Sequence, residues 1–111
     1  MTEIIDHSVL AALSESVGDD FVGELVDTFI EEAPGMFLEM AQALSAEDTD
    51  RFRRAAHSLK TNANTFGATV LAEKAKELEY MARENDLSIG DRLKTLKDSY
   101  EQAVKELKSL S

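Results

Sequence analysis

The chain contains no cysteine, so neither a disulfide framework nor a thiolate zinc site is available to it. Histidine is almost as scarce: His7 and His57 stand far apart, and no histidine-rich metal site is expected. No apolar run approaches the roughly 20 residues that a membrane-spanning helix requires. The first residues lack the basic start and apolar stretch of a signal peptide, so we expect a cytoplasmic protein.

Positive charge is also in short supply, with 12 lysines and arginines against 22 acidic residues and a formal net charge of −10. Such a charge repels both nucleic-acid phosphates and anionic membrane surfaces, so neither nucleic acid nor membrane insertion is expected. The 111 residues, 43% of them hydrophobic, suffice for one globular domain with a real core, spanning residues 1–111.

Alternating strand patterns are missing, whereas helix starts and ends recur. Pro34 is expected to separate two helices, because proline is tolerated in the first turn of a helix but not in its interior. Gly18 and Gly67 mark helix ends. The predicted helices cover about residues 6–17, 19–33, 34–45, the His57 segment up to Gly67, 68–85 and the stretch after Ser88.

Four longer helices joined by short turns favour an all-α fold. We expect an antiparallel four-helix, up-down-up-down bundle with one or two short extra helices at the N-terminal end.

His57 points away from the apolar side of its predicted helix. At about 100° per residue, the apolar residues of this segment gather within roughly 100° of arc, and His57 falls about 140° from Phe52. It shares a strip with Arg53, Lys60, Thr61 and Asn64. With Arg51 and Arg54 close by, positive charge gathers around one histidine in an acidic protein, which would suit a bound anionic group.

The two helices predicted on either side of Pro34 carry more apolar surface than one buried stripe needs. Burial between neighbouring helices is the simpler interpretation, and we prefer it for Leu25, Phe29, Phe37 and Leu44. The edge residues are instead expected to stay partly exposed as a docking patch for a partner. These edge residues are Phe21, Val22, Met36 and Met40.

Few kinds of chemistry are open to such a chain. It has no glycine-rich loop that could hold nucleotide phosphates, so autonomous kinase activity is not expected. Ser58 adjoins His57, but neighbouring side chains diverge on a helix, so a serine nucleophile is not favoured. A lone exposed imidazole can act as a nucleophile near neutral pH. Lys60, Thr61 and Asn64 lie three, four and seven residues further on and could contact a phosphoryl group.

The run from His57 to Ala68, followed by Leu71, Ala75, Leu78 and Glu79, resembles the signature of histidine-containing phosphotransfer (HPt) domains. The resemblance implies a phosphorelay intermediate that takes a phosphoryl group from a receiver-domain aspartate, or from a partner kinase, and passes it to another receiver. His57 would be the phosphorylated nucleophile, Lys60 would offset phosphoryl charge, and Asn64 would hydrogen-bond the ring or the phosphate. Arg53, Arg54 and Gly67 are expected to contribute to partner binding, with a second interpretation open for Gly67, which could instead end its helix and permit close packing.

The same resemblance implies which components come from elsewhere. The partners would be response-regulator receiver domains and a sensor histidine kinase, hybrid or not, and the chain would act as a monomer. It would have no cofactor of its own, because Mg²⁺ would be supplied by the receiver domain. Catalysis in phosphoryl transfer is mainly positioning and charge stabilisation, which two proteins can share.

One position departs from the family pattern, since many members have glycine where this chain has Thr61. We expect Thr61 to tune the rate or the choice of partner. Two other interpretations remain open. The chain could be a receiver-binding adaptor that is never phosphorylated, or a structural bundle that dimerises through its near-heptad final helix.

Overall fold

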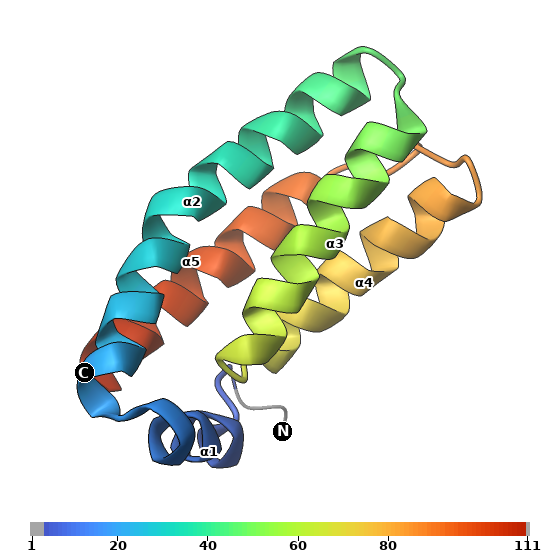
Figure 1. The fold of residues 1–111 in the computed structure, drawn as a ribbon. Helices are drawn as coiled ribbons and strands as arrows, with labels where there is room; N and C mark the ends of the chain where they lie inside the picture. Colours follow the sequence, from blue (N-terminus) through green and yellow to red (C-terminus); the bar gives the residue numbers. More distant parts are fainter. Residues whose placement is uncertain (1–3, 111) are drawn as a thin grey trace.

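The computed structural model describes residues 4–110, which form five helices and no strand (Figure 1). The four long helices lie alongside one another, and the short helix α1 lies across one end of them. Their bounds are α1 His7–Val17, α2 Asp19–Ser45, α3 Thr49–Thr65, α4 Thr69–Arg83 and α5 Arg92–Leu110. The all-α prediction is therefore confirmed. None of these described helices is both long and apolar enough to cross a membrane.

The helix ends lie close to where the sequence places them, because the signals are local. Asp6 precedes α1 and its carboxylate accepts a hydrogen bond from the Ser8 amide at 3.0 Å. Asp48 precedes α3 and accepts from the Arg51 amide at 3.1 Å. Each carboxylate satisfies an amide that the first helical turn leaves without a backbone partner.

The expected break at Pro34 is wrong, because α2 continues from Asp19 to Ser45 with Pro34 inside it. A proline removes one backbone donor and leaves the carbonyl four residues earlier, that of Ile30, without its helical partner. The Tyr100 hydroxyl of α5 donates to this Ile30 carbonyl at 3.5 Å. Burial raises the pKa of Tyr100, so the hydroxyl keeps its proton and can donate. A contact from another helix thus compensates in part for the missing bond.

Packing on both sides of Pro34 also favours the continuous helix. The buried side chains of α2 lie before and after the proline, and several are fully enclosed. Splitting α2 would misalign one half of this apolar stripe with the core, which outweighs the cost of about 3 kcal/mol for proline in a helix interior. The buried residues of α2 are Val26, Phe29, Ala33, Met40 and Ala43.

Helices α3 and α4 pack against each other more extensively than any other pair. Alanine is the most frequent buried residue of both helices, with Ala55, Ala56 and Ala63 in α3 and Ala72, Ala75 and Ala82 in α4. Small side chains let two helix backbones approach closely. A side chain of moderate length on α4 can therefore reach across to the outer face of α3.

Gly67 joins α3 to α4 and is buried against the segment that leads into α1. Its φ is +72°, and its carbonyl accepts a hydrogen bond from the Asp6 amide at 2.6 Å. A Cβ at this position would lie 2.6 Å from the Asp6 carbonyl oxygen, which is closer than van der Waals contact allows. Gly67 is therefore enclosed within the chain, and the expectation that it contacts a partner is wrong.

Replacing Gly67 with alanine is expected to lower the free energy of unfolding by about 2–3 kcal/mol, through a strained φ and a backbone clash. Gly90→Ala is the matched control, since Gly90 also has a positive φ, +59°, but has open space around it. This control should lose only about 1 kcal/mol, from backbone strain alone. Urea unfolding measures both, and equal losses would show that the contact with Asp6 does not matter.

Candidate functional site

His57 lies on α3, on the face that turns away from the core, and its side chain is 56% exposed. The periodicity of the sequence places it there. The ring is nevertheless held on one side, because its Nδ1 atom is within hydrogen-bond distance of the carboxylate of Glu79 on α4. The close approach of α3 and α4 makes this contact possible.

Glu79 is the centre of the site, although only 3% of it is exposed. Its Oε1 atom accepts a hydrogen bond from Nζ of Lys60 at 2.7 Å, while Oε2 faces the His57 ring. A guanidinium nitrogen of Arg83 lies 3.7 Å from Oε1. Burial raises the pKa of Glu79, but the hydrogen bonds and charge of Lys60 and His57 outweigh it and hold the pKa below its usual value. Glu79 is therefore an ionised carboxylate near neutral pH.

An ionised carboxylate fixes the tautomer of a neutral imidazole beside it. Glu79 can only accept hydrogen bonds, so Nδ1 of His57 must carry the proton that lies between them. In the neutral ring the lone pair is then on Nε2. The arrangement thus offers a nucleophilic nitrogen on an exposed side chain, with the ammonium group of Lys60 nearby.

The other two polar residues of the predicted site are exposed on the same helix. The Thr61 hydroxyl donates to the His57 carbonyl oxygen at 3.0 Å, so its proton is engaged by the backbone of its own helix. Asn64 lies seven residues after His57, about two helical turns further along α3. Both stay on the strip that the sequence predicts.

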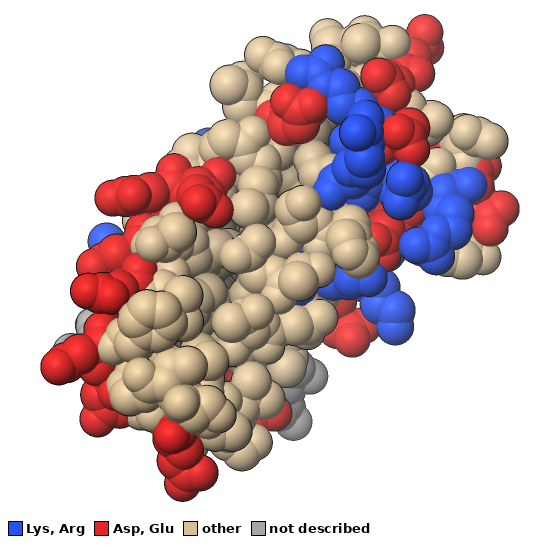
Figure 2. Space-filling model, viewed as in Figure 1, with Lys and Arg blue, Asp and Glu red and all other residues tan. Residues whose placement is uncertain are grey.

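The cations around His57 are balanced by acidic groups more closely than the sequence suggests. Arg53 and Arg54 share Asp50, at 2.8 and 3.1 Å, and Arg51 pairs with Glu39 of α2. Figure 2 shows positive and negative side chains next to one another over this end of the molecule. The region is therefore a network of ion pairs. The sequence predicts a simple excess of positive charge around His57, and the structure corrects this, because acidic groups balance the arginines.

One of the four residues expected to stay partly exposed as a docking patch is buried instead. Met40 is fully buried, so the expectation that it stays exposed is wrong. The reason is the continuity of α2, which places Met40 seven residues, two helical turns, after the buried Ala33 and on the same face. Phe21 is exposed, while Val22 and Met36 are half-buried. Val22 and Met36 lie about 21 Å apart along the helix.

Sequence reasoning missed the role of Glu79 and identified this residue only as part of the motif that follows His57. A physical signal was available. Glu79 lies four residues after Ala75 and three before Ala82, on the face of α4 that carries buried alanines. A carboxylate on such a face must find a hydrogen-bonded cation or lose its charge. The position of that partner across the α3–α4 contact is not visible in the sequence.

Comparison with known proteins identifies the family of the chain. The family model of the Hpt domain matches residues 24–107. The chain belongs to the Hpt domain family. This match covers α3 and α4 entirely, and with them His57, Lys60 and Glu79.

Individual Hpt proteins resemble the chain at moderate identity. It is 29% identical over 84 residues to the phosphorelay protein LuxU of Vibrio vulnificus strain YJ016, covering 76% of this chain and 73% of that protein. LuxU of Vibrio harveyi is 28% identical over 86 residues, with 78% and 75% covered. The crystal structure of histidine-containing phosphotransfer protein B (HptB) from Pseudomonas aeruginosa PAO1 aligns with a TM-score of 0.86 at 28% identity, covering 98% of this chain and 95% of that one.

Proposed function

We propose that this Hpt protein is a phosphorelay intermediate. It accepts a phosphoryl group on His57 from the aspartyl phosphate of a receiver domain, or from a partner kinase, and passes it to the aspartate of another receiver. One observation carries the proposal: His57 is exposed while its Nδ1 atom faces the buried carboxylate of Glu79. The names of LuxU and HptB, a phosphorelay protein and a phosphotransfer protein, support the same role.

The transfer step follows from this arrangement. The Nε2 lone pair of His57 attacks the phosphorus of the aspartyl phosphate, so an N–P bond forms while the P–O bond to the aspartate breaks and the aspartate leaves as a carboxylate. The imidazole keeps its Nδ1 proton and becomes positively charged, facing the negative charge of Glu79. Lys60 offsets charge on the phosphoryl oxygens. The second transfer is the reverse reaction with a different receiver.

The two proteins share the work. The Mg²⁺ ion and the acidic residues that hold it come from the receiver, and the Hpt chain supplies a positioned nucleophile without kinase activity of its own. We further propose that it acts as a monomer in the cytoplasm. In this proposal the four long helices form an antiparallel, up-down-up-down bundle that keeps α3 and α4 rigidly aligned.

A phosphotransfer screen against purified, phosphorylated receiver domains tests the proposal. Wild-type protein is expected to acquire phosphate that is labile in acid and stable in base, and His57→Ala is expected to show only background labelling. Circular dichroism of His57→Ala verifies that the variant folds, which its exposed position allows.

The adaptor interpretation makes the opposite prediction. Receiver binding that survives His57→Ala, with no phosphate detected on the wild-type chain from any receiver or kinase, would replace the relay proposal with a binding role. Phosphate that persists on His57→Ala would place the modified residue elsewhere.

A further inference from the structure

A groove of about 630 Å³ lies between α2 and α5. The rings of Phe37 and Tyr100 line it with their centroids 5.3 Å apart, and Leu38 beside them is 59% exposed. Within residues 4–110 its walls come from α2 and α5 alone, and Figure 1 shows α5 behind α3. The groove is therefore an apolar surface built by other elements than those that carry His57 and Glu79.

Pro34 belongs to the α2 wall of the groove, and neither the core nor a turn requires it there. It is the only proline of the chain, and proline is the least favourable residue for a helix interior. Its side chain is exposed, and α2 continues past it to Ser45. A residue that weakens its helix without serving the core indicates a use at the surface, where the rigid ring extends the apolar wall.

The charge of the groove is opposite to that of the chain. The net charge is −10, yet among the described residues the only charged ones that line the groove are Lys94 and Lys97 of α5. Both are exposed, and within residues 4–110 neither forms an ion pair. Asp98 and Glu101 follow them by four residues, but lysine before the acidic residue is the less favourable order for such a pair in a helix. Two free ammonium groups therefore border the apolar surface, and an acidic partner would complement them.

The dimensions of the groove suit a helix. Its α2 wall extends from Pro34 to Ala41 and its α5 wall from Leu93 to Tyr100, two helical turns in each case, so the groove is about 10 Å long. A helix lying along α2 and α5 would present apolar side chains over this same length, at positions i, i+3, i+4 and i+7.

We propose that this groove binds an acidic amphipathic helix of a partner protein. Apolar side chains of that helix pack against Leu38 and the ring of Phe37, and its carboxylates pair with Lys94 and Lys97. The proposal goes beyond the proposed function, because the groove contains no part of the phosphotransfer site. A receiver can exchange phosphate with His57 while the groove is occupied, so the partner helix tethers the Hpt chain without blocking it.

Two fluorescein-labelled peptides of about 18 residues, long enough to form a helix, test the proposal. Both have leucine at positions i, i+3, i+4 and i+7, with glutamate beside this stripe in one peptide and lysine in the other. Fluorescence anisotropy at low salt is expected to give a Kd on the order of 10–100 μM for the acidic peptide and about tenfold weaker binding for the basic one. The net charge of the chain favours the basic peptide over most of the surface, so a preference for the acidic peptide can come only from a local site. Equal binding of the two peptides, a preference for the basic one, or no binding of either overturns the proposal.

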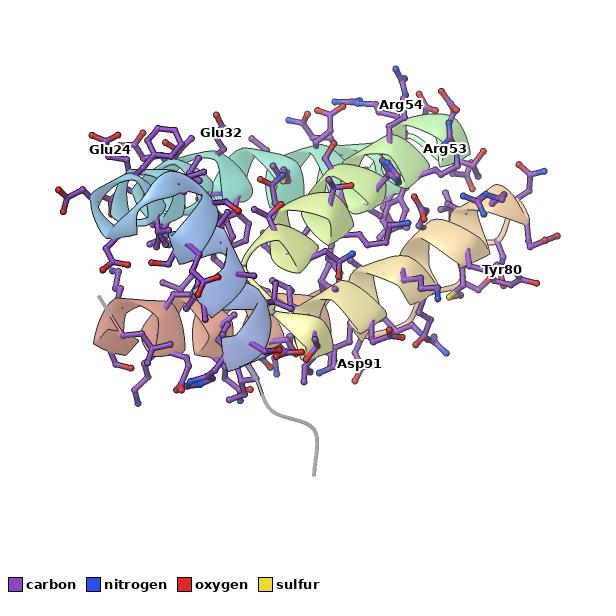
Figure 3. The ribbon with its side chains drawn as sticks, turned by 60° about the horizontal axis from the view of Figure 1, so that its bottom comes forward. Glu24, Glu32, Arg53, Arg54, Tyr80 and Asp91 are labelled. Atoms are coloured by element: carbon purple, nitrogen blue, oxygen red, sulfur yellow. The ribbon has the colours of Figure 1, made fainter. Side chains whose placement is uncertain are left out.

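Truncation of an apolar side chain locates the bound peptide. Leu38→Ala should weaken binding of the acidic peptide about tenfold. Tyr80→Ala is the matched control, because Tyr80 is 60% exposed but projects from α4 (Figure 3), and its Kd should stay within about twofold of wild type. Both side chains are exposed, so both variants are expected to fold. Equal losses in the two variants would place the peptide outside the groove and overturn the proposal.

Charge reversal tests the role of the two lysines. Lys94→Glu/Lys97→Glu should reverse the preference between the peptides at low salt, with the effect shrinking at high salt. Lys76→Glu/Lys105→Glu makes the same change in net charge at other exposed positions and should keep the preference for the acidic peptide. The same response in both double variants would mean that only net charge matters, which also overturns the proposal.

Phosphotransfer kinetics separate this proposal from the proposed function. Leu38→Ala and Lys94→Glu/Lys97→Glu should keep the KM for a phosphorylated receiver within about twofold of wild type, with and without saturating acidic peptide. A KM that rises in these variants or with the peptide would make the groove part of the receiver surface and overturn a separate partner. A wild-type chain that takes no phosphate from any receiver would remove the proposed function alone, since peptide binding is measured without a phosphodonor.

Discussion

Replacing Glu79 with alanine is expected to slow phosphotransfer to His57 about 10-fold to 100-fold. A loss of about this size is typical when the hydrogen-bonded residue that orients a functional side chain is removed. Without the carboxylate, the proton of the ring is no longer held on Nδ1, and the positive charge that develops on the phosphorylated imidazole loses its counter-charge. Single-turnover transfer from a phosphorylated receiver measures the rate. Unchanged kinetics would show that Glu79 serves only the fold.

The same substitution is expected to lower the free energy of unfolding by about 2 kcal/mol, since it removes charge-assisted hydrogen bonds to a buried group. The loss stays moderate because Lys60 and His57 can both reach water. Glu77→Ala is the matched control on the same helix. Glu77 is exposed and pairs with Arg92 at 2.7 Å, and such surface pairs contribute only about 0–1 kcal/mol.

The stabilisation of the fold by Glu79 should be lost at acidic pH. The folded-state pKa lies below the usual value of 4.5, so the stabilisation is complete above pH 4.5 and is lost as the pH falls through the folded-state pKa. Wild-type protein should therefore lose more stability between pH 5 and pH 3 than Glu79→Gln, whose amide does not titrate there. Parallel stability curves for the two proteins would contradict an ionised Glu79.

Local signals explain why much of this fold can be predicted from the sequence. Asp6 and Asp48 cap helices through amides two and three residues away, and the 3.6-residue period places His57 on the outer face of α3. These features depend on neighbours within one or two helical turns. The histidine and its strip could therefore be identified before any tertiary contact was known.

The features that escaped prediction depend on distant contacts. Pro34 stays inside α2 because its packing is continuous and because Tyr100, 70 residues beyond Ile30, donates to the carbonyl that proline leaves unpaired. Met40 is buried as a consequence of that continuity. Glu79 reaches His57 across 22 residues of chain. Propensity correctly describes proline as a helix breaker, but tertiary packing decided the outcome in this case.

The second large effect is expected from Phe29→Ala, with a loss of about 3–5 kcal/mol of unfolding free energy. Phe29 is 1% exposed and joins three parts of the molecule, since it projects from α2 towards Phe66 at the end of α3 and Tyr100 of α5. The ring centroids lie 5.4 Å from Phe66, in a stacked pair, and 5.6 Å from Tyr100, edge to face. Truncation removes both aromatic contacts and leaves a cavity between the helices.

Phe21→Ala provides the comparison, because Phe21 is the same residue type two turns earlier on α2 but is 46% exposed. Its loss should stay within about 1 kcal/mol, whereas Phe29→Ala should lower the Tm on the order of 15 °C. Since Phe66 lies nine residues beyond His57, about 13 Å along the helix direction, phosphotransfer by Phe29→Ala should stay close to wild type well below its Tm. Equal stabilities for the two variants would contradict the packing of Phe29 between α2, α3 and α5.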